Sequence, residues 1–273
     1  MLRFLRDFGR SLRRVYTGAS LYAQALAFNM FLTMFPMLLF VIGLLASSRR
    51  ASAVFDELLR MRWVLPPGSR EIIFEYLNQH SVNPAEWLAL GLTGTLMAGT
   101  QCMAVLLECF RSMEGDIPRP AFWRQHLRAL VLLCLAVGPG LAAVILTAFG
   151  RQLRHWLSVY VGGPAIAHLI WLWIAVAAAL LVALIILALL YRVGQPRLNN
   201  WKDVLPGAAL AIGLWWVANI GFGFYVRRTP YSPIYGGLAA VIGLLVWMQL
   251  SGLVVILGAA YNLERARSPL LKP

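Results

Sequence analysis

Side chains that usually carry acid–base or metal chemistry are few and scattered in this sequence. Among 273 residues there are 11 acidic residues and 4 histidines, and the histidines are isolated from one another. Glu114 and Asp116 lie close together, but a solvated loop explains that pair. Metal-assisted hydrolysis of RNA needs clustered histidine and carboxylate ligands facing water, and no HxHxDH motif occurs. The residues therefore argue against a ribonuclease, and we expect no enzyme, no metal site and no cofactor.

The cysteines and the glycines give no further site. Cys102, Cys109 and Cys134 lie within or beside apolar segments and form no CxxC pair, so we interpret them as small apolar packing residues. The phosphate-binding motif GxxxxGK[ST] does not occur. Its absence excludes direct ATP-driven pumping by this chain alone.

Polar side chains inside long apolar runs are better candidates for function. Such groups are costly in hydrocarbon, so they bind one another or line a water-filled path. Asn29, Thr33 and Pro36 share one helix face by their spacing, and Gln101 and Glu108 share another. The full set of path candidates is Asn29, Thr33, Pro36, Gln101, Glu108, Asn219, Gln249 and Asn262. Two alternatives stay open: each group could simply join helices by hydrogen bonds, and Glu108 fits the headgroup level as well as membrane depth.

The elements that must position these side chains are membrane-spanning helices. The chain is 60% apolar and only 13% charged, which is about half the charged fraction of a soluble domain. A run of about 20 apolar residues crosses a bilayer as a helix. Six runs meet this requirement, namely residues 21–46, 85–107, 127–150, 165–190, 203–226 and 235–262.

Three details of these spans can be predicted. Pro36 lacks an N–H group and clashes with the carbonyl of Leu32, so a kink in the first span is expected. Asp203 is a candidate N-cap of the fifth span, with Pro206 in its first turn. The third and fourth spans carry few polar side chains, so we expect them to face lipid.

Residues 1–20 have the pattern of a basic amphipathic helix. On a helical projection, one arc is apolar and the opposite arc holds Arg3, Arg6, Arg10, Arg13 and Arg14. A helix of this kind lies in the membrane interface and binds anionic lipid headgroups. We therefore expect membrane lipids to be partners of this segment.

The predicted fold class is an all-α polytopic membrane protein with six transmembrane helices. It comprises the interfacial helix at 1–20, a transmembrane domain at 21–262 with a helical outer loop at 47–84, and a tail at 263–273. With a cytoplasmic N-terminus, the inner segments hold 15 Lys and Arg in 64 residues, against 9 in 60 for the outer ones. This bias predicts that both termini are cytoplasmic. Headgroups and topology also explain the net charge of +13 better than nucleic acid does.

Three segments carry a resemblance to a known family. Residues 201–208 read WKDVLPGA, residues 234–240 read IYGGLAA, and residues 25–36 join ALAF to TMFP. These segments resemble the BrkB/YihY family of bacterial inner-membrane proteins, whose members have carried a ribonuclease BN label, a virulence label and proposed transport roles. The family commonly has an acidic residue between the last glycine and the asparagine, whereas residues 258–262 read GAAYN here. A coupling mechanism that needs that carboxylate would not work in this protein.

Two functions remain after these exclusions. The first is a transporter or flippase of a lipid, an amphiphile or a small solute, located in the bacterial inner membrane. The alternative is a non-transporting scaffold that binds an envelope partner. Either is compatible with a homo-oligomer. A cavity at membrane depth would favour the first, and closed packing would favour the second.

Overall fold

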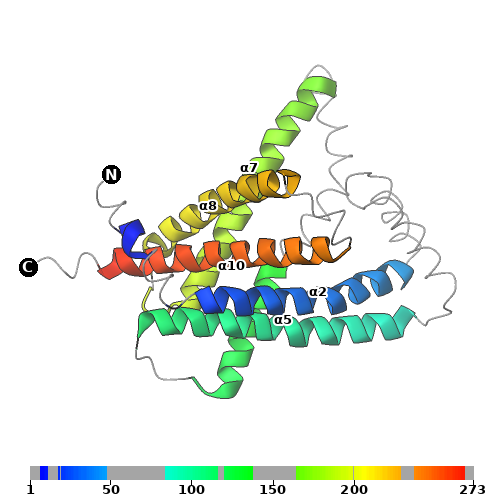
Figure 1. Cartoon of the computed structure of the whole chain (residues 1–273), viewed down its shortest axis with the longest axis horizontal. Helices are drawn as coiled ribbons and strands as arrows, with labels where there is room; N and C mark the ends of the chain where they lie inside the picture. Colours follow the sequence, from blue (N-terminus) through cyan, green and yellow to red (C-terminus); the bar gives the residue numbers. More distant parts are fainter. Residues whose placement is uncertain are drawn as a thin grey trace, which may run out of the picture. The chain divides into compact units, whose positions relative to one another are not determined.

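The computed structural model of the chain describes residues 7–11, 18, 20–47, 84–115, 120–137, 164–198, 200–228 and 237–267. Regular structure in these ranges is helical throughout (Figure 1). The chain divides into two compact units. The large unit is Met1–Phe31 with Thr100–Pro273, the small unit is Leu32–Gly99, and each is described by itself.

The long helices agree in position with five of the six predicted spans. They are α2 (Ser20–Ser47), α5 (Pro84–Glu114), α7 (Pro164–Gly194), α8 (Trp201–Arg228) and α10 (Gly237–Arg267). In the described part of the chain, these five are long and apolar enough to cross a membrane. The third predicted span is described only as far as residue 137, so the count of six spans stays a prediction.

Two other predicted elements fall largely outside the described residues. Of the N-terminal amphipathic segment, residues 7–11 form a short helix in which Arg10 is exposed and Asp7 and Ser11 are buried. The remaining arginines of that segment lie outside the described residues, and so do residues 48–83 of the outer loop. The interfacial helix and the helical loop are therefore still predictions.

Two sequence-based expectations about the helix boundaries were wrong in detail. α5 continues past Leu107 to Glu114, because Glu108 and Arg111 pair along the helix rather than ending it. α8 begins at Trp201, which places Asp203 in the first turn and not at the N-cap; a carboxylate there still interacts favourably with the helix N-terminus. In the fourth span, the described residues from Trp173 to Val182 are largely exposed and only Ala188 and Leu190 are buried, so its lipid-facing position stays a prediction.

In the small unit, α2 and α5 run antiparallel and pack through glycines. A Cβ atom at Gly91 of α5 would overlap the backbone of Phe40, and one at Gly94 would lie 2.7 Å from the Pro36 ring. On α2, a Cβ atom at Gly43 would lie 2.7 Å from the backbone nitrogen of Leu88. Small residues let membrane helices approach until their backbones touch, so these glycines set the α2–α5 contact.

In the large unit, α7, α8 and α10 pack around a core that the end of α5 completes. Ile256, Ala259 and Leu263 of α10 are buried in it, together with Phe110 of α5 and Tyr191 of α7. The Phe110 and Tyr191 rings meet edge to face with centroids 5.8 Å apart. Figure 1 shows the start of α8 beside the end of α10, where Gly207 contacts Gly258. The C-terminal ends of α5, α7 and α10 thus lie at one end of the large unit.

Candidate functional site

A pocket of about 290 Å³ lies at that end of the large unit, and we call it the polar pocket after its charged and amide side chains, although most of its lining surface is apolar. Its volume is near the lower limit for small-molecule sites. Three segments form it: the end of α5, the start of the helical stretch at 122–137, and the end of α7 with the turn that follows. Its lining residues are Leu107, Glu108, Arg111, Pro120, Gln125, Arg128, Val193, Gly194 and Pro196.

A glycine brings the walls of this polar pocket together. A Cβ atom at Gly194 would overlap the Phe110 ring, so only glycine lets the end of α7 approach α5 this closely. The α7 helix also ends at Gly194. The position of this residue therefore places the following turn, with Pro196, over the last turns of α5.

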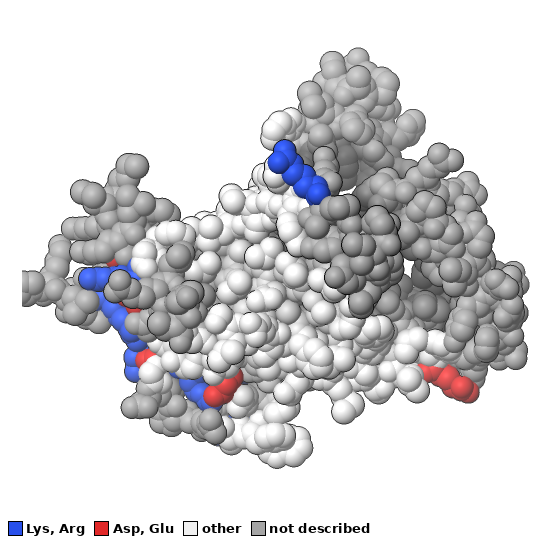
Figure 2. All heavy atoms as spheres, in the orientation of Figure 1, with Lys and Arg blue, Asp and Glu red and all other residues white. Residues whose placement is uncertain are grey.

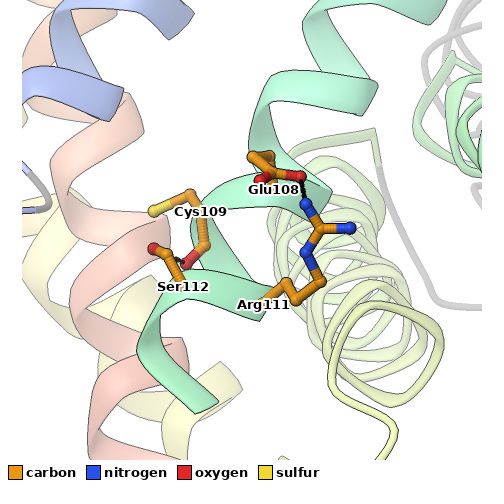
Figure 3. Close-up of polar contacts among 4 residues, drawn as sticks. All are labelled: Glu108, Cys109, Arg111 and Ser112. Atoms are coloured by element: carbon orange, nitrogen blue, oxygen red, sulfur yellow. Dashed lines mark hydrogen bonds and ion pairs between the residues drawn. The ribbon is translucent and has the colours of Figure 1, made fainter. Parts of the chain in front are cut away.

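Glu108 and Arg111 form an ion pair on one side of α5. They are three residues apart, which puts their side chains on the same helix face. Figure 3 shows the Arg111 guanidinium reaching back to the Glu108 carboxylate, while Cys109 and Ser112 project from another side of the helix. Arg111 is only 15% exposed and Glu108 is 31% exposed. The carboxylate therefore holds a cation that water reaches poorly.

The opposite wall supplies a second cation and an amide. Gln125 and Arg128 are three residues apart in the stretch at 122–137, so they share a face. Arg128 is exposed, and within the described ranges it takes part in no hydrogen bond or ion pair. The polar pocket thus holds two guanidinium groups, one amide and one carboxylate.

A second cavity, the apolar groove, lies between α7, α8 and α10 in the same unit. Its volume is about 420 Å³, and its lining includes Leu180, Ala183 and Leu187 of α7, Trp215 of α8 and Val254 of α10. The indole N–H of Trp215 donates to the Ser251 hydroxyl over 3.3 Å. With its polar atoms bonded to each other, the groove suits a hydrocarbon group.

The apolar groove and the polar pocket follow each other along α7. Leu187 lines the groove and Gly194 lines the pocket. A separation of seven residues puts both on nearly the same helix face, about 10 Å apart along the axis. The two cavities therefore lie at successive levels along α7.

Buried polar side chains of the large unit bond α10 to α7 and α8. The Asn262 side chain accepts a hydrogen bond from the Gly207 N–H (2.7 Å) and donates one to the Val204 carbonyl (3.0 Å). On the α7 side, Tyr191 donates to the Val255 carbonyl (2.8 Å) and Gln195 to the Ala259 carbonyl (3.0 Å). Asn262, Tyr191 and Gln195 are fully buried. We call these three residues the clasp.

Glu114 is a buried residue at the C-terminal end of α5, at the same end of the large unit. Its side chain is 1% exposed, and neither oxygen accepts a hydrogen bond of normal geometry from the described residues. Arg197 and Arg267 donate to its backbone carbonyl instead, and their charges lie close enough to attract the carboxylate. Glu114 thus lies between two cations and does not line the polar pocket.

Charged side chains of the described residues gather at this end of the large unit. On the face shown in Figure 2 most of the coloured side chains lie where α10 ends; a further blue group and a further red group lie elsewhere, and the surface between them is uncharged. The sequence pattern of the virulence factor BrkB family matches residues 15–272. The chain belongs to the virulence factor BrkB family. The resemblance noted from residues 25–36, 201–208 and 234–240 is therefore confirmed.

Relatives in the BrkB family cover most of this chain. The YfkH protein of Bacillus subtilis (strain 168), whose name describes it as ribonuclease-like, is 27% identical over 91% of this chain and 90% of its own length. The UPF0761 membrane proteins of Xanthomonas axonopodis pv. citri and Xanthomonas euvesicatoria pv. vesicatoria are 26% identical over 93% of this chain. The chain spans 60% and 59% of those two proteins. No solved structure matches this BrkB family chain.

The path candidates are distributed over several environments in this BrkB family protein. Glu108 lines the polar pocket. Asn262 belongs to the clasp, and Asn219 accepts a hydrogen bond from the Trp247 indole (2.9 Å) across α8 and α10. Asn29 donates to the Ala25 carbonyl of its own helix (2.8 Å), and Gln101 is exposed. Three candidates remain: Thr33 and Pro36 belong to the small unit, and Gln249 is half-buried on α10.

The sequence reasoning missed most residues of the polar pocket. The sequence prediction treats Arg111, Gln125 and Arg128 only as parts of the cytoplasmic segment at 108–128. The spacing of Glu108 and Arg111 was a usable signal, because opposite charges three residues apart favour a continuing helix. Across the described ranges, no three His, Cys, Asp or Glu side chains gather where a metal ion could bind, and the expectation of no metal site stays a prediction.

Proposed function

We propose that this BrkB family membrane protein is a transporter or flippase, and that its substrate is an amphiphile. The observation that carries the proposal is the pair of cavities along α7. A charged pocket at the helix ends and an apolar groove about 10 Å deeper correspond to the polar and apolar parts of such a molecule. Thr33 and Pro36 of the small unit remain candidates for its path.

The depth of the two cavities relative to the candidate membrane spans supports this function. Candidate spans include Ala85–Glu114 and Val176–Gly194, and the polar pocket is lined by residues near the ends of both. The apolar groove is lined from Val176 to Leu187 on α7, which is inside the span. An amphiphile bound there would have its polar part at the membrane interface and its apolar part at membrane depth.

A lipid translocation assay tests the proposal. Purified protein is reconstituted into vesicles with a trace of fluorescent phospholipid, and a membrane-impermeant reductant then bleaches the outer leaflet. Transport predicts that the bleached fraction rises above the value for protein-free vesicles. A fraction equal to that of protein-free vesicles for anionic, zwitterionic and neutral lipids would rule out this flippase activity.

The second candidate function is a membrane scaffold, and the clasp is the observation that favours it. Three fully buried side chains fasten α10 to α7 and α8, so that part of the large unit is rigid. A scaffold of this kind would show no translocation of any lipid, and it would be recovered with an envelope partner after crosslinking in cells.

A further inference from the structure

The polar pocket carries one net positive charge. Arg111 and Arg128 contribute two guanidinium groups, which stay protonated in proteins, and Glu108 contributes one carboxylate. A singly charged anion would therefore neutralise the pocket. A phosphodiester carries one negative charge, shared over two non-bridging oxygens that can each accept from one guanidinium group.

The donors of the polar pocket suit phosphate oxygens. Guanidinium groups bind phosphate through two parallel N–H donors, with charge-assisted bonds about twice as strong as neutral ones. Arg128 has no partner among the described residues, and Gln125 adds an amide N–H group from the same helix face. Arg111 bonds Glu108 through one terminal nitrogen, which leaves further N–H donors of its guanidinium for a phosphate.

The apolar groove distinguishes a lipid from a free anion. A free phosphate would need only the polar pocket. The groove follows the pocket along α7, is lined almost wholly by carbon, and lies within the candidate span Val176–Gly194. A hydrocarbon chain attached to the phosphate would reach it without leaving the membrane.

We propose that the polar pocket binds the phosphodiester headgroup of an anionic membrane lipid, with one acyl chain in the apolar groove. Arg128 and Arg111 bind the phosphate oxygens, and Gln125 supplies a further donor. Glu108 neutralises Arg111 while the pocket is empty. This inference rests on the proposed function, because it names the substrate class of the same site.

Equilibrium binding to the full chain in a neutral detergent tests the assignment. Four probes separate the parts of the ligand: phosphatidylglycerol, diacylglycerol, glycerophosphoglycerol and inorganic phosphate. We expect phosphatidylglycerol to bind most tightly, diacylglycerol to bind weakly for lack of a phosphate, and the two chain-free anions to bind weakly for lack of an acyl chain. Inorganic phosphate binding as tightly as phosphatidylglycerol would overturn the lipid assignment in favour of a free-anion site.

Single substitutions with matched controls test whether the lipid binds at these two cavities. Arg128→Gln should weaken phosphatidylglycerol binding roughly tenfold or more, since a bond to a charged group is lost, and Arg128→Lys should retain part of the affinity. Arg124→Gln is the control, because Arg124 is exposed one turn away and does not line the pocket. Ala183→Phe should fill the apolar groove and weaken phosphatidylglycerol without affecting glycerophosphoglycerol. Equal affinities for Arg128→Gln and Arg124→Gln would refute the headgroup site.

Binding and translocation are measured separately, so each hypothesis can fail alone. If phosphatidylglycerol binds as expected but no lipid crosses the bilayer, the headgroup site stands and the flippase function fails. If lipids cross with no preference for anionic headgroups and Arg128→Gln has no effect on binding, the headgroup site fails and the flippase function stands. Thermal unfolding of every variant identifies any substitution that acts by misfolding, and Arg128→Lys then decides the outcome in place of Arg128→Gln.

Discussion

Asn262→Ala should destabilise the large unit without stopping its activity. The substitution removes both the acceptor of the Gly207 N–H and the donor to the Val204 carbonyl. Hydrogen bonds between membrane helices contribute ~0.6 kcal/mol on average and at most about 1.7 kcal/mol. Two such bonds at a fully buried residue therefore predict a loss of about 1–3 kcal/mol in the free energy of unfolding.

The assay for this prediction is reversible unfolding of purified protein in mixed micelles, followed by circular dichroism. Ser251→Ala is the matched control on the same helix. Ser251 is half-buried and accepts one longer bond, 3.3 Å from the exposed Trp215, so its loss should stay at or below about 0.6 kcal/mol. The difference between the two variants isolates the effect of the clasp.

Two results would contradict this reasoning. Equal unfolding free energies for Asn262→Ala and Ser251→Ala would show that the buried bonds of Asn262 contribute nothing beyond an exposed one. A fully stable Asn262→Ala protein that no longer moved lipid would show instead that Asn262 acts on the substrate path, as its polarity in an apolar run predicted.

Three further predictions follow from other parts of the chain. Gly91→Ala should cost about 1–3 kcal/mol of stability, because the added methyl overlaps the Phe40 backbone; thermal unfolding checks this against Gly213→Ala, where a Cβ atom meets nothing within 4 Å. Gln101→Leu should abolish lipid translocation with little change in melting temperature if Gln101 lines a path, and full activity would remove it from the path. A peptide of residues 1–20 should partition onto anionic vesicles and dissociate as salt is added, since surface charges are screened over ~8 Å at physiological ionic strength; salt-independent partitioning would argue against an electrostatic surface helix.

The positions of the long helices could be predicted from the sequence because apolar runs bounded by charge leave few alternatives. The predicted run at 21–46 corresponds to α2 at Ser20–Ser47, and the run at 203–226 to α8 at Trp201–Arg228. The end of α5 could not be found this way. Hydropathy drops at Glu108, but the backbone continues as a helix to Glu114, because the side chain of Arg111 returns to Glu108.

The candidate site was less accessible to sequence reasoning, for a different physical reason. A polar side chain in or beside an apolar run was enough to identify Asn262 and Glu108 as candidates. Asn262 belongs to the clasp, and Glu108 lines the polar pocket. The partners of Asn262, however, are backbone groups of Gly207 and Val204, which every residue carries and no pattern reveals. Arg128 becomes a candidate only because three segments pack around one pocket and place its side chain in the lining. Only the folded chain brings those segments together.

The clasp also fixes the axial register of α10 against α7. The donors Tyr191 and Gln195 are four residues apart, and so are their acceptors on Val255 and Ala259, so a slide of one helical turn, about 5.4 Å, would offer each donor an equivalent carbonyl. The glycine at position 258 excludes that shifted register. The Tyr191 hydroxyl lies where a Cβ atom of residue 258 would stand, and one turn away along α10 the corresponding residues are Val254 and Asn262, whose side chains would block it. Any movement of α10 during a working cycle must therefore carry α7 with it as one body, and alternating access would have to arise by motion between this body and other helices.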